Sequence, residues 1–285
     1  MMRHLVYRRW VLVFAGLIIG PALATEDCAT GESLYQQAVE TVVPRQRITL
    51  LEQAIALCPT FTAWYTAGQT YLELQQPDTA LTAFETARRL AEDAHYQGLA
   101  LGRAGEAYLA QGAEAEAVGA VNSAIERFTE RPPPDWLIEL RRQLDRMTAG
   151  QVIPAEQLKK TLSLSRSFSS VPSVQIRVQF AYDSAVLDDA GRLQVNELGK
   201  ALVDLQGSAR RIQVIGHTDI QGSESYNQQL SEQRANTVAI ALTRSFPALA
   251  GQLATSGRGE AEPIYEGDSE EDHYLNRRVE VQLLP

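Results

Sequence analysis

The sequence has only two cysteines, Cys28 and Cys58, among 285 residues. Two thiols are too few for a disulfide-scaffold protein or a four-thiolate zinc site. The four histidines show no metal-ligand spacing, so we expect neither a metal site nor a cofactor. Glycine and proline, at 19 and 12 residues, are not enriched, which excludes collagen-like and linker-dominated chains.

Positive charge is also scarce, since 26 lysines and arginines stand against 35 acidic residues and give a formal net charge of −9. Nonspecific nucleic-acid binding needs a basic surface, so we expect no nucleic-acid partner. The 45% of hydrophobic residues can nevertheless build a core. A chain of this length forms one large domain or two ordinary ones.

Long apolar runs are missing except near the N-terminus. Three arginines between positions 3 and 9 precede the run Trp10–Ile19, which is followed by Pro21-Ala22-Leu23-Ala24. This order predicts a secretory signal peptide over residues 1–24, and the run is too short for a spanning helix. An uncleaved membrane anchor is the alternative. Cleavage would leave 261 residues with a net charge of −12 in an oxidising compartment outside the cytoplasm.

Residues 25–147 show the pattern of a helical repeat. Small and large residues recur at the offsets of a tetratricopeptide unit, in which small residues let two helices approach and large ones fill the gaps. One copy comprises Trp64, Ala67, Gly68, Tyr71, Ala80, Phe84 and Ala87, and the next Ala104, Gly105, Tyr108, Gly112, Ala117, Val121 and Ala124. A degenerate earlier copy includes Leu34, Ala38, Leu51, Ala54 and Pro59.

The spacing of these copies predicts about three helix pairs and a capping helix at Trp136–Leu144. Tyr71 and Tyr108 are 37 residues apart rather than 34, so we expect a longer turn between the two copies. An ordinary helical bundle is the alternative. Cys28 opens the first helix and Cys58 closes its antiparallel partner, so these cysteines could form a disulfide; two buried thiols are the alternative.

Residues 174–285 predict an α+β domain, preceded by a linker over residues 148–173. Apolar residues alternate along strands at 174–180 and 279–283, and a third strand covers 212–217. The ranges 187–205 and 223–244 are predicted as helices.

Arg234 interrupts the apolar stripe of the second of these helices. It shares one face with Asn227, Leu230 and Val238, at helical spacing. A buried guanidinium needs an anion or several acceptors. A structural ion pair, for example with Asp219, would explain it as well as a bound ligand would.

Four motifs occur in order in this region. They are Phe180-x-x-Asp183-Ser184-Ala185-x-Leu187, Gly216-His217-Thr218-Asp219-x-x-Gly222, Tyr226-Asn227-x-x-Leu230-Ser231-x-x-Arg234-Ala235 and Asn276-Arg277-Arg278-Val279-Glu280. Together they resemble the OmpA-like C-terminal domain, a peptidoglycan-binding module. The resemblance covers residues 174–285, under half of the chain.

This resemblance implies a βαβαββ-type mixed sheet with helices on one face. It also implies binding of the diaminopimelate side chain of peptidoglycan by one aspartate and one arginine, here Asp219 and Arg234. The carboxylate would accept from the ammonium of this zwitterion and the guanidinium would hold its carboxylate. Supporting contacts fall on Asp183, Thr218, Asn227 and Arg277.

We therefore expect a noncatalytic protein of the periplasm that binds peptidoglycan through its C-terminal domain and an unidentified envelope protein through its repeats. Outer-membrane association without a spanning segment is left open. Alternatively, the repeats drive assembly of a complex, and peptidoglycan binding only positions the protein. A cell-wall hydrolase is a further alternative, although no nucleophile–base pair supports it.

The acidic run 266–272 lies close to the last of the four motifs. We expect it to be a solvated surface loop. Alternatively, it folds over the site and weakens binding to the anionic cell wall.

Overall fold

The computed structural model describes residues 21–148, 150–168, 171–181, 184–205 and 211–284. The chain divides into two compact units, residues 1–59 and 60–285. Most of the predicted signal peptide, residues 1–20, lies outside the described part. Among the helices that are described, none combines the length and apolar character needed to cross a membrane.

The first unit is a helix pair, α1 (Pro21–Glu40) and α2 (Pro44–Leu57). Pro44 starts α2 at a position where its missing N–H costs nothing. Ala38 and Leu51 are fully buried between the helices. A disulfide joins Cys28 to Cys58 and ties the two helices together.

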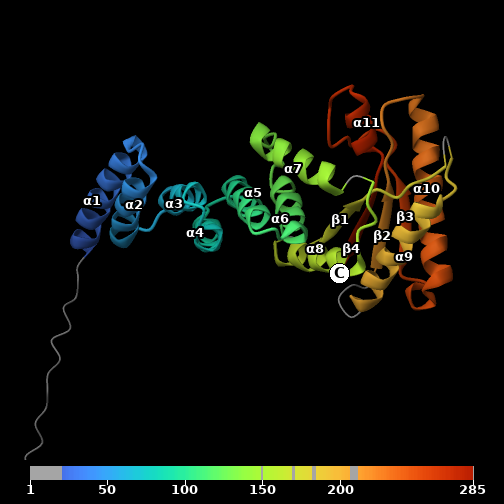
Figure 1. Cartoon of the computed structure of the whole chain (residues 1–285), viewed down its shortest axis with the longest axis horizontal. Helices are drawn as coiled ribbons and strands as arrows, with labels where there is room; N and C mark the ends of the chain where they lie inside the picture. The colour runs from blue at the N-terminus through green and yellow to red at the C-terminus, as the bar shows by residue number, and fades with distance from the viewer. Residues whose placement is uncertain (1–20, 149, 169–170, 182–183, 206–210, 285) are drawn as a thin grey trace, which may run out of the picture. The chain divides into compact units, whose positions relative to one another are not determined.

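Two further helix pairs open the second unit (Figure 1): α3 (Phe61–Glu73) with α4 (Pro77–Leu90), and α5 (Ala94–Ala110) with α6 (Glu114–Ile125). In each pair a glycine lets the two helices approach closely. A Cβ on Gly68 would lie 2.5 Å from the Phe84 ring, and one on Gly105 would lie 2.6 Å from Val121. The helix pairs lie where the repeat pattern predicts them, while the tetratricopeptide interpretation itself stays a prediction.

The longer spacing between the copies has another cause than the turn we expected. Three residues connect α3 to α4, and three connect α4 to α5. Instead, α5 has 17 residues and α3 only 13. The expectation of a longer turn was therefore wrong, because the extra residues extend a helix whose N-terminus is capped by the Asp93 side chain.

Helices α3 to α6 form what we call the helical layer, and helix α7 (Asp135–Thr148) covers its end. Its Leu137, Leu140 and Leu144 are buried against Leu101 and Val121 of the preceding pair. The opposite side of α7 is rich in charged residues, which contact the C-terminal domain as described below.

A helix, α8 (Ala155–Phe168), occupies most of the region where we expected a linker. Leu158 and Leu162 on one side are buried in the core of the C-terminal domain. On another side, the Thr161 hydroxyl donates to the carbonyl of Ala115 in α6 at 3.1 Å. Because α8 packs on both neighbours, it connects the helical layer and the C-terminal domain through buried contacts.

A mixed four-stranded sheet forms the centre of the C-terminal domain. Its strands are β1 (Ser173–Ile176), β2 (Arg211–Gly216), β3 (Leu253–Gly257) and β4 (Val279–Leu284). They are ordered β1-β4-β2-β3, with β2 and β3 parallel and the other neighbours antiparallel. Val281 pairs with both Val174 and Val214, which aligns the apolar side chains of three strands on one face.

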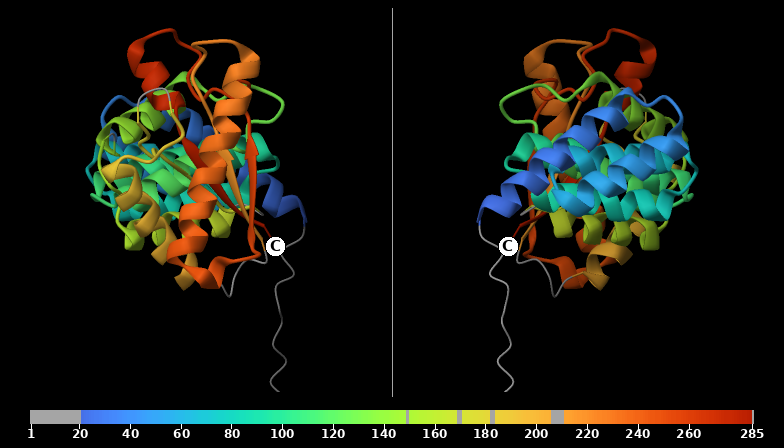
Figure 2. Two further views of the ribbon diagram at one scale, coloured as in Figure 1. Left: turned by 90° about the vertical axis from the view of Figure 1, so that its right-hand side faces the viewer. Right: turned by 90° about the vertical axis from the view of Figure 1, so that its left-hand side faces the viewer.

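Helices α9 (Asp189–Asp204) and α10 (Glu224–Ser245) cover this apolar face (Figures 1 and 2). Asp188 and Ser223 cap their N-termini by accepting backbone N–H groups. A short 3-10 helix, η2 (Pro247–Leu249), leads to β3, and α11 (Glu270–Asn276) precedes β4. The predicted mixed sheet with helices on one face is confirmed.

Candidate functional site

The candidate site begins where β2 ends. His217, Thr218 and Asp219 follow its last residue and are all buried. The His217 N–H donates to the Arg278 carbonyl at 3.0 Å, and the Thr218 N–H donates to the Gly259 carbonyl at 2.9 Å. These backbone hydrogen bonds hold the turn in place and thereby position the backbone of Asp219.

Asp219 is 7% exposed and forms an ion pair with Arg277. One carboxylate oxygen also accepts the backbone N–H of Gln221 at 3.0 Å. From the sequence we considered an ion pair between Asp219 and Arg234. In the structure Asp219 pairs with Arg277, a residue 58 positions away in sequence.

Asn227 holds the loop that carries Asp219. This side chain is 1% exposed, and its amide nitrogen donates to the carbonyls of Asp219 and Gln221 at 3.2 and 3.1 Å. It also donates to the Glu260 carboxylate. With the amide nitrogen so engaged, Asn227 acts mainly as a support for the backbone around Asp219.

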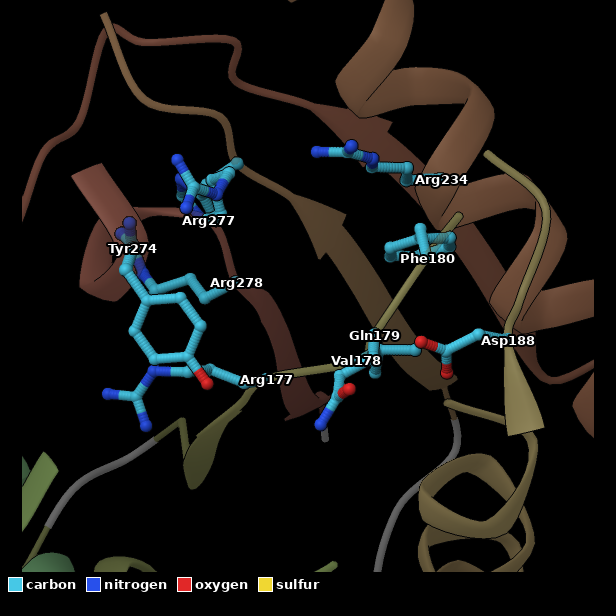
Figure 3. A pocket seen from close by; sticks show the side chains of 10 residues that line it. Arg177, Val178, Gln179, Phe180, Asp188, Arg234, Tyr274, Arg277 and Arg278 are labelled. Carbon is cyan, nitrogen blue, oxygen red and sulfur yellow. The ribbon is translucent and has the colours of Figure 1, made fainter. Parts of the chain in front are cut away.

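Arg234 lies one turn from the buried Leu230 and Val238 of α10, on the stripe that the sequence predicts. Its Nε donates to the Ser184 carbonyl at 3.1 Å. Its guanidinium carbon lies 5.0 Å from the centroid of the Phe180 ring, within cation–π range. In Figure 3 the Arg234 guanidinium points toward the side of the pocket on which Arg277 lies.

A pocket of about 220 Å³ lies between these elements. In Figure 3, Arg234 and Phe180 form one side, and Arg277, Arg278, Tyr274 and Arg177 lie opposite. The remaining lining residues are Val178, Gln179, Asp188 and His217. Four arginines thus converge on one cavity of a chain that is acidic overall.

Burial alters the electrostatics at the base of the pocket. His217 is 1% exposed, and burial lowers the pKa of its imidazole, which favours the neutral form. Burial also lowers the pKa of Arg278 to about 10, still well above neutrality. The Arg278 guanidinium donates to the carbonyls of Asn276 and Glu262, which makes it a structural cation of the loop.

The structure brings together Asp219, Arg277, Asn227 and Thr218 in one cluster beyond the end of β2, and it places Arg234 on the pocket that Arg277 also lines. The Thr218 hydroxyl is buried without a hydrogen-bond partner among the described residues. Asp183 lies outside the described residues. Within the described ranges, no group of three histidine, cysteine or carboxylate side chains is arranged to hold a metal ion.

Of the lining residues, only Arg234 and Arg277 belong to our candidate set, and those it lacked include Arg177, Tyr274 and Arg278. Arg278 belongs to the last motif, so the signal for it was present. Arg177 was assigned to the polar face of a strand over 174–180, but β1 ends at Ile176 and the residues after it line the pocket. Tyr274 had no local signal, since α11 begins within the acidic run and shows no apolar stripe.

The acidic run 266–272 is only partly solvated. Asp268 is exposed, whereas Asp272 is 5% exposed and forms an ion pair with Arg142 of α7. Glu271 receives two hydrogen bonds from Arg146, at 2.7 and 2.8 Å. The end of the run therefore contacts α7 instead of forming the free surface loop we expected.

Comparison with known proteins places this domain in a family. Residues 179–277 match the model of the OmpA family. Outer membrane porin F of Pseudomonas aeruginosa is 30% identical over 115 residues, which are 40% of this chain and 32% of the porin. The probable lipoprotein YiaD of Escherichia coli is 38% identical over 109 residues, or 38% of this chain and 48% of YiaD.

A peptidoglycan-associated lipoprotein of Legionella pneumophila is 38% identical over 101 residues, covering 35% of this chain and 56% of that protein. Among solved structures, the cell wall anchor of the T6SS from Pseudomonas aeruginosa is 30% identical, with a TM-score of 0.36, over 40% of this chain and 81% of that chain. The C-terminal domain is therefore an OmpA-family domain. The chain spans about a third to a little over half of the length of the three curated relatives.

Proposed function

We propose that the C-terminal domain binds the diaminopimelate side chain of peptidoglycan stem peptides. The observation that carries this proposal is a nearly buried carboxylate, Asp219, paired with an arginine that lines a pocket shared with Arg234. The end of the diaminopimelate side chain is a zwitterion, so it needs a hydrogen-bond acceptor for its ammonium and a donor for its carboxylate within a few ångströms. The match to the OmpA family and the similarity to a peptidoglycan-associated lipoprotein support the same ligand.

The proposed chemistry divides the zwitterion between the two charges. Asp219 accepts hydrogen bonds from the ligand ammonium, and Arg234 grips the ligand carboxylate in a bidentate pair. Arg277, which neutralises Asp219 in the free protein, turns toward the same carboxylate. Thr218 and Asn227 support these contacts, the first through its unpaired hydroxyl and the second through its hold on the Asp219 loop. From the family resemblance, Asp183 adds a further contact.

This binding would place the protein in the periplasm, on the cell wall. The relatives include outer-membrane porins and peptidoglycan-associated lipoproteins, which supports a location in the cell envelope.

Sedimentation with purified sacculi tests the proposal. Asp219→Ala and Arg234→Ala should each lower the affinity about tenfold or more, because each removes a charge-assisted hydrogen-bonding partner. Asp204→Ala and Arg244→Ala are matched controls of the same residue types and should bind as the wild type does. A stem peptide with lysine in place of diaminopimelate lacks the second carboxylate and should compete poorly. Wild-type sedimentation by both site variants would refute the assignment.

We further propose that the domain is noncatalytic and acts by holding the cell wall. The family relatives are structural envelope proteins by name, such as a porin and peptidoglycan-associated lipoproteins. Incubation of the purified protein with sacculi, followed by chromatography of the supernatant, should release no soluble muropeptides. Their release would support a hydrolase instead.

A second role is proposed for the helical layer, as the binding site of an envelope protein. A groove of about 520 Å³ lies between α4 and α5 beside Leu164 of α8, and Phe84, Leu101 and Tyr108 contribute to its lining. Stacked helix pairs offer such grooves to extended segments. If the same partners are recovered after Tyr108→Ala and Arg89→Glu as with the wild type, this groove is not their site.

A further inference from the structure

Helix α7 makes an unusual set of contacts with the part of the C-terminal domain that leads to the pocket. Three successive charged positions on its outer side, Arg142, Asp145 and Arg146, all reach residues between 265 and 272. These contacts span at least 120 positions of sequence. They join the helical layer to the segment that carries Tyr274 and Arg277, two residues lining the proposed ligand site.

The first arm of this contact holds the beginning of α11. Arg142 pairs with Asp272, whose side chain is 8% exposed. Arg146 forms a bidentate pair with Glu271, at 2.7 and 2.8 Å. Both carboxylates have a pKa lowered by hydrogen bonds, to Arg146 for Glu271 and to Ser269 and Arg142 for Asp272, so both are ionised at neutral pH.

The second arm reaches the end of α11. The hydroxyl of Tyr265, a 2% exposed residue, donates to the Asp145 carboxylate at 2.6 Å. Asn276 donates to the Tyr265 carbonyl at 2.8 Å and accepts the Tyr265 N–H at 3.1 Å. Asn276 is the last residue of α11 and precedes Arg277, so the chain of contacts ends at the ion pair with Asp219.

We propose that α7 is a brace that positions α11 and thereby Arg277 in the ligand site. The geometry supports this role because α7 holds the start of this seven-residue helix directly, through Asp272, and its end indirectly, through Tyr265 and Asn276. A helix that short is not stable by itself, so its placement must come from such tertiary contacts. The guanidinium carbon of Arg142 also lies over the Tyr265 ring, 4.3 Å from its centroid, which links the two arms.

The inference has a functional consequence, which rests on the proposed peptidoglycan binding. Anything that displaces α7, such as a partner seated on the helical layer, would loosen Arg277 and lower the affinity for the cell wall. Conversely, a ligand that fixes Arg277 would protect α11 and strengthen the α7 contacts, because coupling between two sites is reciprocal.

Hydrogen exchange and peptide binding on the full chain test the brace together. Arg142→Ala/Arg146→Ala should raise the exchange rate of amides in residues 264–278 about tenfold, with α10 unchanged. The same variant should lose about two- to thirtyfold in affinity for a diaminopimelate stem peptide. Arg88→Ala, which breaks an ion pair within α4, is the matched control and should change neither measurement.

Two further variants separate positioning from general stability. The swap Arg146→Glu/Glu271→Arg keeps opposite charges at the contact and should bind within about threefold of the wild type, whereas Arg146→Glu alone should not. Tyr265→Phe removes only the hydroxyl of the second arm and should speed exchange at Asn276 and Arg277. Unchanged exchange in residues 264–278 would overturn the brace. Faster exchange with unchanged peptide affinity would overturn its coupling to the site. If the wild type fails to bind the peptide, the proposed function fails, and exchange alone decides on the brace.

Discussion

Gly216, the last residue of β2, lies in close contact with the backbone of α10 beside the site. A Cβ at this position would lie 2.1 Å from the Ser231 carbonyl oxygen and 2.9 Å from its carbon. Both atoms belong to the backbone of α10, so no side chain can move to relieve the clash. The absence of a side chain is what lets α10 approach the end of β2 and bring Asn227 against the Asp219 loop.

Gly216→Ala should therefore lower the free energy of unfolding of the C-terminal domain by about 1–3 kcal/mol, the usual cost of overpacking. Urea denaturation followed by far-UV circular dichroism would measure it. Ile240→Ala, at a position of α10 that is 61% exposed, should cost less than about 0.5 kcal/mol. Equal stabilities for the two variants would mean that α10 can shift to accept the methyl group.

Single residues also show how far the sequence could lead. Asp219, Arg234 and Asn227 were found because their spacing repeats a known motif. The pairing of Asp219 with Arg277 was not, because the partner lies 58 positions away and charge alone offers many candidates. Asp272 was expected in solvent for the same reason, since its partner Arg142 belongs to another layer of the fold.

Among the elements, those with strong periodicity were predicted best. Alternation along β4 and the apolar stripe of α10 are local signals, and both elements lie within two residues of their expected ends. Helix α8 was missed because its residues contact two different neighbours. Leu158 faces the sheet domain while Thr161 faces α6, so no single stripe marks the helix.

Helix α8 should behave as part of the C-terminal domain even though it precedes residues 179–277. Leu158→Ala and Leu162→Ala each create a cavity at a 1% exposed position and should cost about 2–5 kcal/mol. Chemical denaturation monitored by hydrogen exchange in β2 and β4 would locate the loss. Lys159→Ala, on the same helix with a partly exposed side chain, is the control. Normal protection of both strands in the leucine variants would show that α8 belongs to the helical layer alone.

The first helix pair depends on its disulfide. Cys28 and Cys58 are 30 positions apart, and closing a loop of that length stabilises the folded state by about 3–4 kcal/mol in the chain-entropy model. Cys28→Ser/Cys58→Ser should make residues 21–59 sensitive to limited proteolysis at protease levels that leave residues 60–285 intact. Equal resistance of the wild type and this variant would show that helix packing alone holds the pair.

At the scale of the whole molecule, an acidic chain carries a cluster of arginines at its proposed ligand site. The formal net charge of −9 would become −12 after removal of residues 1–24, and the cell wall is itself anionic. Long-range electrostatics therefore oppose the encounter, while Asp219 and Arg234 act only over contact distances.

Salt separates these two contributions. Between about 10 mM and about 100 mM ionic strength the screening length falls from about 30 Å to about 10 Å, which weakens the long-range repulsion but little of the contact within the pocket. Binding to sacculi should thus stay constant or become tighter as salt rises. A small basic protein without a diaminopimelate site, measured in parallel, should lose most of its binding. A tenfold or greater loss for the wild type over this range would mean that an attractive charged surface, rather than the Asp219 and Arg234 site, drives its association with the cell wall.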